Sequence, residues 1–253
     1  MCKFLFILIR ISFMALPLHV HAHSFTIGVE NQDYLPYFTY QKRQYQGITR
    51  ELLDAFASSQ GYIFRYKALP VKRLFNDFLA GKVDFKFPDN SNWQAELKQR
   101  RLQKGQPITY SDYVLRFVDG VMVLPENKGT GLRQFKKLGT ILGFTPWAWL
   151  EQIKAGSVKK LETSNYHNLI NMAISKRIDG IYANVVVGAY QLRQMNKKKA
   201  LVFDPSLPHS DDYYFLSSIN YPQIIKRFNQ FMRDNKALIE QLKAKYKVEE
   251  GLP

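Results

Sequence analysis

The sequence has very few of the residues that build disulfides and metal sites. Among its 253 residues are one cysteine and five histidines. Cys2 lies in the N-terminal segment, so we expect no disulfide or cysteine-based metal site in the rest of the chain. Beyond residue 22, His23, His167 and His209 are too scattered to predict a metal centre. The sequence shows neither a serine, histidine and acid arrangement nor a glycine-rich phosphate loop, so we expect no cofactor and no enzyme.

Long apolar runs are lacking except at the N-terminus. Residues 4–18 are apolar apart from Arg10 and Ser12, Lys3 precedes them, and Val20-His21-Ala22 follows. The run is too short and too broken to span a membrane well. Its basic start and small-residue ending are typical of a cleavable signal peptide, with a retained anchor as the alternative. We expect residues 1–22 to be removed and the cysteine-free product to reside in a bacterial periplasm.

Acidic residues are scarce as well. The chain has 21 Asp and Glu against 36 Lys and Arg, a net charge of +15. Such a charge attracts anions, including nucleic acid. The basic residues are dispersed apart from short runs such as 197–199, and export argues against nucleic acid. We therefore expect a solvated basic surface and no nucleic-acid partner, and an anionic ligand or membrane surface remains an alternative.

One helix-to-strand unit is present twice. Leu79–Trp93 (LAGKVDFKFPDNSNW) and Ile174–Asn184 (ISKRIDGIYAN) each lead from an apolar helical run through a basic residue, a β-branched residue and an aspartate into a short apolar strand. Ligands of open α/β sheets bind at the carboxyl ends of the strands. We therefore expect Asp89 and Asn184, each five residues after the aspartate, beside a ligand, and the aspartates at the opposite, structural ends.

Apolar periodicity and Gly/Pro punctuation predict an α/β protein with two lobes. A βαβαβ order fills the first part, and a polar stretch at 90–113 with a short helix at 93–102 separates it from a long apolar run at 114–124, the first crossing between lobes. A second set of strands and helices follows, with a cap expected at Thr163 or Ser164, and a loop at 205–212 leads back to lobe one. One long helix begins at Pro222. The predicted strands are 25–29, 63–69, 83–87, 139–143, 178–183, 201–204 and 213–217. We place lobe one at 23–113 and 208–253 and lobe two at 114–207.

In order and spacing, these segments resemble the periplasmic solute-binding proteins of the polar amino-acid type, family three, receptors for ATP-driven importers. The resemblance covers about residues 25–248. It implies a type II-like periplasmic binding protein fold, in which two α/β lobes joined by two crossing hinge segments close on a small ligand. The motifs that carry it are Tyr34–Phe38 (YLPYF), Gly47–Leu53 (GITRELL), Leu79–Asp84 (LAGKVD), Ile108–Tyr113 (ITYSDY), Gly143–Thr145 (GFT) and Lys176–Asp179 (KRID).

The resemblance also implies site residues. An aromatic after the first strand stacks on the ligand in such proteins, which points to Tyr34, with Tyr37 or Phe38 behind it; the alternative is that these rings only close the core. Thr145 matches a hydroxyl residue that receives a ligand carboxylate at a helix start, and a plain helix cap is the alternative. We expect the ligand between Tyr34, Asp89 and Trp93 of lobe one and Thr145, Trp147 and Asn184 of lobe two.

Two positions depart from that family. The arginine that clamps a ligand carboxylate has no clear equivalent, because the segment before the crossing is too long, and Arg100, Arg101 and Lys104 compete for the role with a solvated helix face as the alternative. The acid that would pair with an α-ammonium group aligns with the neutral Asn184. An ordinary α-amino acid is therefore not expected as the ligand unless Asp89 replaces that acid.

The expected function is a monomeric periplasmic receptor that binds a small polar solute, delivers it to an ABC permease and contacts the membrane only through such a partner. A periplasmic sensor subunit that docks on a membrane receptor is the main alternative, and the sequence does not separate the two. A dehydratase-like enzyme on the same fold is a further alternative.

Overall fold

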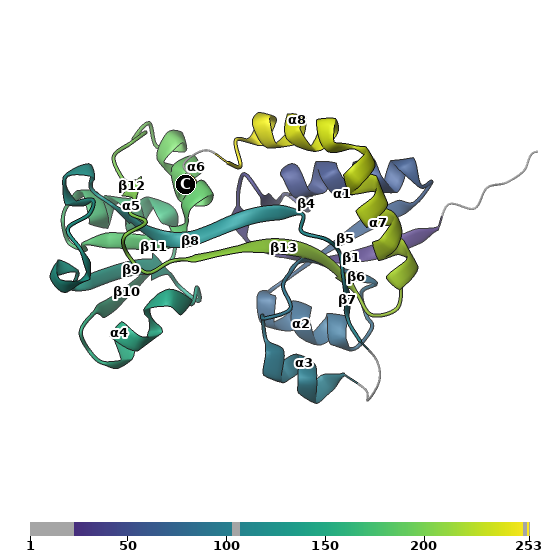
Figure 1. Ribbon diagram of the computed structural model, residues 1–253, viewed down its shortest axis with the longest axis horizontal. Helices are drawn as coiled ribbons and strands as arrows, with labels where there is room; N and C mark the ends of the chain where they lie inside the picture. Colours follow the sequence, from purple (N-terminus) through teal and green to yellow (C-terminus); the bar gives the residue numbers. More distant parts are fainter. Residues whose placement is uncertain (1–22, 103–106, 250–251, 253) are drawn as a thin grey trace, which may run out of the picture.

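The computed structural model describes residues 23–102, 107–249 and 252. The predicted signal peptide with Cys2, and Lys104, lie outside these residues. Two long strands, β8 (Leu115–Val123) and β13 (Ser210–Ser218), run between two lobes (Figure 1). Within the described ranges, no helix is both long and apolar enough to cross a membrane.

Lobe one is built on the parallel strands β1, β5 and β6. Helices α1, α7 and α8 lie on one side of this sheet and α2 on the other (Figure 1). Its strands are β1 (Ser24–Glu30), β2 (Asp33–Tyr34), β3 (Phe38–Gln41), β4 (Gln44–Gln46), β5 (Ile63–Leu69), β6 (Phe85–Asp89) and β7 (Thr109–Tyr110). Its helices are α1 (Ile48–Ser59), α2 (Val71–Leu79), α3 (Ala95–Arg101), α7 (Pro222–Asp234) and α8 (Lys236–Tyr246).

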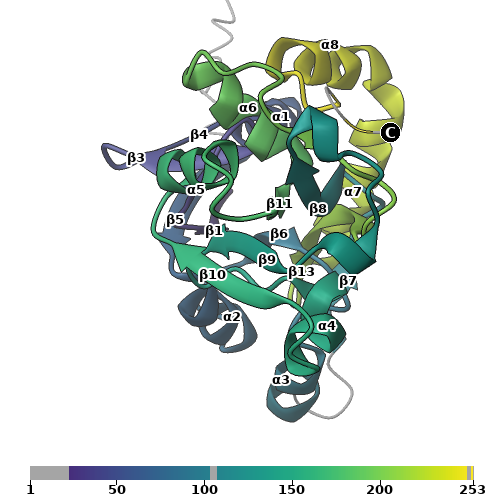
Figure 2. The ribbon, with the colours of Figure 1, turned by 90° about the vertical axis from the view of Figure 1, so that its left-hand side faces the viewer.

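Lobe two repeats the arrangement around the parallel strands β10, β9 and β11. Figure 2 views it end on, with α5 and α6 on one side of the sheet and α4 on the other. Its strands are β9 (Lys137–Ile141), β10 (Lys159–Thr163), β11 (Gly180–Asn184) and β12 (Val202–Phe203). Its helices are α4 (Leu150–Lys154), α5 (Tyr166–Ile174), α6 (Val185–Gln194) and the short 3-10 turns η1 (Pro125–Asn127), η2 (Leu132–Gln134) and η3 (Trp147–Trp149).

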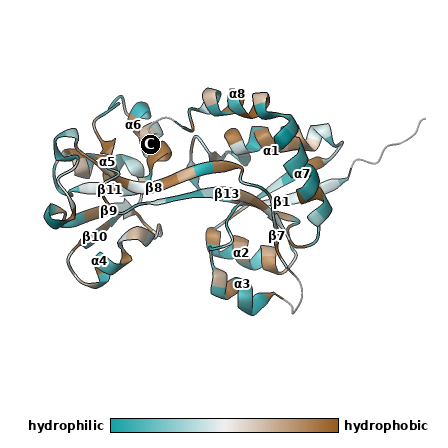
Figure 3. Ribbon diagram, in the orientation of Figure 1, coloured by the Kyte–Doolittle hydropathy of each residue, from teal (hydrophilic) through white to brown (hydrophobic). Residues whose placement is uncertain are grey.

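Hydrophobic residues fill a core in each lobe. In lobe one, Phe56 of α1 packs against Phe228 and Phe231 of α7, with ring centroids 5.1 and 5.5 Å apart. In lobe two, Trp149 and Phe135 pack at 4.7 Å on one side of the sheet. Figure 3 shows the crossing strand β8 as mainly hydrophobic and the first half of β13 as hydrophilic. The crossing strands are therefore part of both cores, with polar side chains where β13 leaves lobe two.

Strand direction determines where the two lobes meet. The main path of the sheet has the order β10-β9-β11-β8-β13-β6-β1-β5. Since β8 runs from lobe one into lobe two and β11 is antiparallel to it, β11 and its parallel neighbours end toward lobe one. Since β13 runs back and β6 is antiparallel to it, β6, β1 and β5 end toward lobe two. The carboxyl ends of both sets, where ligands gather in such sheets, therefore face each other between the lobes.

The aspartates of the repeated unit have the structural role that the sequence predicts. The Asp84 carboxylate accepts the backbone N–H of Thr26 at 2.7 Å. The Asp179 carboxylate accepts the N–H groups of Lys136 and Lys137, both at 2.7 Å. Each aspartate thus fixes the start of its own strand to a neighbouring strand, at the end away from the other lobe.

Several predicted elements differ in the structure. The prediction of a single C-terminal helix is wrong. The helix breaks at Asn235, whose side chain donates to the Phe231 carbonyl and so competes with helix continuation. Strand β13 begins at Ser210, inside the predicted loop, because it pairs with β8 from there on. The cap of α5 is Asn165, which accepts the Asn168 N–H at 2.9 Å, rather than Thr163 or Ser164. Helix α6 was not predicted, because its β-branched start at 185–187 favours a strand.

Candidate functional site

Three polar residues form a row across the sheet where the lobes meet. Asp119 of β8 is the direct cross-strand partner of Asn184 of β11 on one side and of Ser210 of β13 on the other. Directly opposed residues of antiparallel strands point to the same face of the sheet. The row Asn184–Asp119–Ser210, called the polar row below, therefore lies at the end of β11, in the middle of β8 and at the start of β13.

Asn184 has its amide oriented by a helix. Its Oδ1 accepts the backbone N–H groups of Val186 and Val187, both at 3.1 Å, and so caps α6. Its Nδ2 is then directed away from the helix, buried, and without a hydrogen-bond partner among the described residues. Asn184 thus presents a buried donor beside Asp119, and it carries no charge.

Asp119 is a half-buried acid whose Oδ1 is enclosed and unsatisfied. Its Oδ1 has no hydrogen-bond partner within the described part of the chain. Burial raises the pKa of Asp119 from 3.8 to about 7, and the Asn184 amide opposes this shift. Sequence reasoning missed this residue. The available signal was a lone aspartate inside the apolar run VLRFVDGVMVL at 114–124.

Tyrosines from both lobes surround Asp119. In each of them burial raises the pKa, and the negative charge of Asp119 raises it further, so the hydroxyls stay protonated near neutral pH and remain available as donors and acceptors. They come from the loop after β1, from β13, from α5 and from β11. These tyrosines are Tyr34, Tyr37, Tyr166, Tyr182 and Tyr214.

The predicted stacking residues lie in this cluster. Tyr34 and Phe38 stack at 5.2 Å, and Tyr37 meets Tyr214 edge-on at 5.4 Å. The Tyr37 hydroxyl donates to the Arg116 carbonyl on β8 at 2.9 Å. Tyr34, Tyr37 and Phe38 are all buried. They therefore pack in the lobe-one core, as the alternative from the sequence expects, and stacking on a ligand stays a prediction.

Trp93 extends the aromatic cluster. Its ring lies 6.0 Å from Phe117 and 5.9 Å from Tyr214, and these two stack on each other at 4.5 Å. Phe117 is two residues from Asp119 on β8 and therefore points to the same face of the sheet. Trp93 is half-buried. The structure thus brings Trp93 together with Tyr34 and Tyr37 beside the polar row.

Asp89 is enclosed within lobe one. It is fully buried, and its Oδ1 lies 3.2 Å from both the Lys86 and the Lys98 ammonium groups. Its Oδ2 accepts the Ser217 hydroxyl at 2.6 Å. Asn90 donates its backbone N–H to Oδ1 at 2.8 Å. Both carboxylate oxygens are therefore occupied by protein donors, which leaves Asp89 with a structural environment.

The predicted arginines lie elsewhere. Arg100 and Arg101 are exposed in the last turn of α3, and Figure 1 shows that helix running away from lobe two. The basic residue that instead reaches the end of β6 is Lys98, which also donates to the Asn90 carbonyl at 2.6 Å. The structure does not bring Arg100 or Arg101 to the polar row.

Thr145 and Trp147 lie in the segment between β9 and α4. Both are exposed, Trp147 to 62%. No side chain caps η3 or α4, so Thr145 is not the plain helix cap that was its alternative reading. These two residues follow the carboxyl end of β9, which faces lobe one, and remain accessible there.

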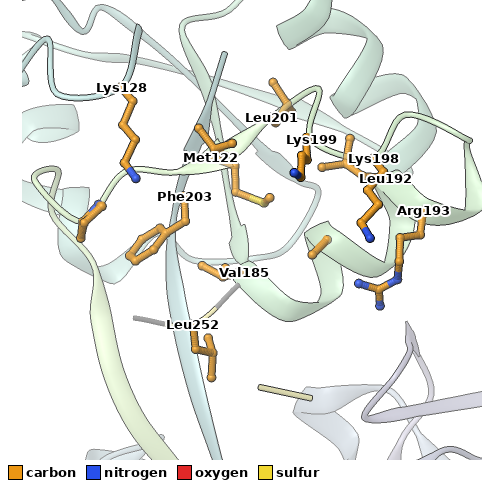
Figure 4. A pocket seen from close by; sticks show the side chains of 13 residues that line it. Met122, Lys128, Val185, Leu192, Arg193, Lys198, Lys199, Leu201, Phe203 and Leu252 are labelled. Carbon is orange, nitrogen blue, oxygen red and sulfur yellow. The ribbon is translucent and has the colours of Figure 1, made fainter. Parts of the chain in front are cut away.

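Two cavities lined by described residues lie outside the polar row. One, of about 370 Å³, lies between β8, β12 and α6, with Phe203, Val185 and Leu252 on its apolar side and Lys128 and Lys199 among its cations (Figure 4). The other, of about 280 Å³, lies between Leu35 and Pro36 of lobe one, α6 and the end of α8. Within residues 23–102, 107–249 and 252, no group of three or more His, Cys, Asp or Glu is placed to hold a metal ion.

No family model and no curated protein matches the sequence. Solved structures do match its fold. The second substrate-binding domain of Lactococcus lactis GlnP, in an open conformation, is 16% identical with a TM-score of 0.61 over 89% of this chain and 96% of that one. A histidine kinase sensor domain similar to periplasmic binding proteins is 17% identical, with a TM-score of 0.65 over 89% and 96%. AncCDT-1, an ancestral amino-acid-binding protein and precursor of cyclohexadienyl dehydratase, is 18% identical, with a TM-score of 0.62 over 88% and 95%. This confirms the predicted two-lobe, type II-like periplasmic binding protein fold.

Proposed function

We propose that this protein is a periplasmic receptor that binds a small polar solute between its lobes and delivers it to an ABC permease, as a member of the polar amino-acid-binding family that its sequence resembles. The observation that carries the proposal is the polar row. Buried polar atoms without partners are rare in folded proteins and need an explanation. The polar row holds two of them, Asp119 Oδ1 and Asn184 Nδ2, at the point where the strand ends of both lobes face each other.

The tyrosine cluster covers the polar row, so a solute reaches it only when the lobes separate. We propose lobe boundaries at 113/114 and 207/208, with β8 and β13 as the hinge. Two strands that continue from one lobe into the other can bend while each core stays intact. The GlnP domain, whose structure is described as open, supports such a movement by its fold.

A sensor subunit is the second candidate. It is favoured by the histidine kinase sensor domain, which aligns with a TM-score of 0.65 over 89% of this chain. Such a protein binds its solute in the same way and differs in its partner at the membrane. We do not propose catalysis, because AncCDT-1 is itself described as an amino-acid-binding protein.

Native mass spectrometry of the protein purified from periplasm tests receptor function. The expected result is a small solute that remains bound under native conditions and leaves on denaturation. Adding that solute to stripped protein is expected to lower the radius of gyration in solution scattering. Tyr34→Ala is expected to abolish retention, whereas the control Tyr113→Ala, at a position 64% exposed, retains it. Absence of a retained solute together with an unchanged radius of gyration would contradict the proposal.

Uptake measurements separate the two candidates. A strain that lacks the protein is expected to lose uptake of the retained solute. Intact uptake together with the loss of a transcriptional response to that solute would identify the sensor subunit instead.

A further inference from the structure

The polar row presents an acceptor that the protein itself leaves unused. Asp119 Oδ1 is buried and receives no hydrogen bond from the described residues. The neighbouring Asn184 amide has its oxygen held by α6 and only its Nδ2 remaining. A carboxylate kept from water without a donor is costly, and a donor supplied by a solute removes that cost.

Among the described residues, no cation shifts the pKa of Asp119: burial raises this pKa, and the Asn184 amide opposes the shift. Glu30, a second acid whose pKa burial raises to about 7, differs because Lys86 opposes that shift. Asp119 is therefore the acid in this region that lacks a counter-charge, although the chain as a whole is strongly basic.

The basic side chains around the polar row are engaged with acids. Lys86 and Lys98 both bind Asp89. Arg116 points from β8 to the face opposite Asp119 and makes two hydrogen bonds to the Asp211 carboxylate at 2.8 and 2.5 Å. Lys86, Lys98 and Arg116 are therefore already paired with aspartates, and none of them is reserved as a charged partner for a solute carboxylate.

Aromatic rings favour a cation at the same place. Tyr34, Tyr37 and Tyr214 belong to the lobe-one core near Asp119, with ring centroids 6.1 Å apart for Tyr34 and Tyr37 and 5.4 Å apart for Tyr37 and Tyr214. A ring face attracts a cation, and this attraction grows when water is excluded. The hydroxyls of these tyrosines can accept hydrogen bonds from a solute N–H.

We propose that the solute is a primary amine bound as its cation, and that Asp119 on the hinge strand β8, rather than the residue at the end of β11, accepts its ammonium group. This inference rests on the proposed receptor function and specifies its ligand. Asn184 then serves to orient the neighbouring donor and to cap α6. An α-carboxylate on the solute contributes little, because the protein offers it no charged partner.

Titration of Asp119 adds a pH signature. The groups that face it are neutral near pH 7: Tyr34 of β2, Tyr37 of the following loop, Tyr166 of α5, Tyr182 and Asn184 of β11, and Tyr214 of β13. Because an ammonium group requires the ionised carboxylate, affinity should rise with pH through about 7.

Calorimetric titration of solute-free protein tests the inference. The probes are 1,4-diaminobutane, ethanolamine and arginine, beside butanedioate, ethylene glycol and hexanedioate, which have no amine. We expect wild-type protein to bind at least one amine and none of the others. Asp119→Asn, which keeps the side-chain volume, should weaken that binding by about 100-fold. Glu30→Gln is the matched control, since it neutralises the acid that already has a lysine nearby, and it should bind as wild type does.

The pH dependence provides a second measurement. Amine affinity is expected to fall about tenfold from pH 8 to pH 6 in wild type and Glu30→Gln, and to show no such slope in the residual binding of Asp119→Asn. The free energy of unfolding of Asp119→Asn at pH 8 should be no lower than that of wild type, which shows that the variant is folded. An amine affinity that survives Asp119→Asn would overturn the inference, and so would a native solute that has no amine. A native solute without an amine would still agree with the proposed receptor function. Failure to retain any solute would contradict both the receptor function and this inference.

Discussion

The Lys98 ammonium group lies 3.2 Å from Asp89 Oδ1, inside lobe one and at the end of β6. The same oxygen holds Lys86 at 3.2 Å, so one carboxylate pairs with two buried cations. Burial lowers the pKa of Lys98, and the charge of Asp89 opposes that shift. This arrangement gives Asp89, the first residue of the DNSNW segment, a structural role that the sequence did not predict.

Asp89→Asn is expected to lower the free energy of unfolding by about 3 kcal/mol, because it leaves two buried ammonium groups without a carboxylate. Urea denaturation at pH 7 measures the loss. Arg101→Ala, at an exposed position on α3, is the control and should change stability by less than about 0.5 kcal/mol. An Asp89→Asn protein that unfolds normally but no longer binds its solute would instead make Asp89 a ligand-binding residue.

Asp119→Asn is expected to stabilise the solute-free protein at pH 8 and to have little effect at pH 4. An acid whose pKa is higher in the folded state than the ordinary value of 3.8 favours folding when protonated, and that advantage is lost as the pH rises through the folded value of about 7. The gain at pH 8 should be about 1 to 3 kcal/mol. Thermal unfolding of both proteins across this pH range checks it. A constant difference between them at all pH values would exclude a raised pKa.

Gly180→Ala tests the packing of β11 against β8. A Cβ at this position would lie 2.7 Å from Val121 Cγ1 and 2.9 Å from the Met122 carbonyl oxygen. Since a backbone atom cannot move aside cheaply, we expect a loss of about 2 kcal/mol in unfolding free energy. Lys159→Ala, exposed on β10, is the control. Equal stability of the two variants would show that the strands can separate without cost.

Cleavage after Ala22 is expected in a host with a general secretion pathway. The intact mass of the exported protein should then correspond to residues 23–253, starting at His23. Loss of residues 1–22 removes Lys3 and Arg10 and no acid, which leaves a net charge of +13. An exported product that retains residues 1–22 would identify a membrane anchor.

Local patterns in the sequence determined most of the strands and helices. Strand β5 occupies its predicted range at 63–69. The aspartates 84 and 179 hold the structural ends of their strands, because each unit needs only its own residues and an adjacent backbone to form. The two-lobe fold followed from the order of these units. Helix α6 and the break at Asn235 escaped prediction, because β-branched residues and an apolar stripe that continues across the break favour the wrong local structure.

Only the tertiary structure decided which polar side chains come together. Residues 119, 184 and 210 lie on three segments, and the register of β8 with β11 and β13 brings them into one row. A shift of one residue in either pairing would turn Asp119 to the opposite face from its partner. Asp89 shows the converse, since its position at a strand end suggested a ligand, while Lys86 of the same strand, Lys98 of α3 and Ser217 of β13 occupy its oxygens. Long-range strand pairing, which a single sequence does not encode in any local pattern, therefore brought Asp119 beside Asn184 and Ser210.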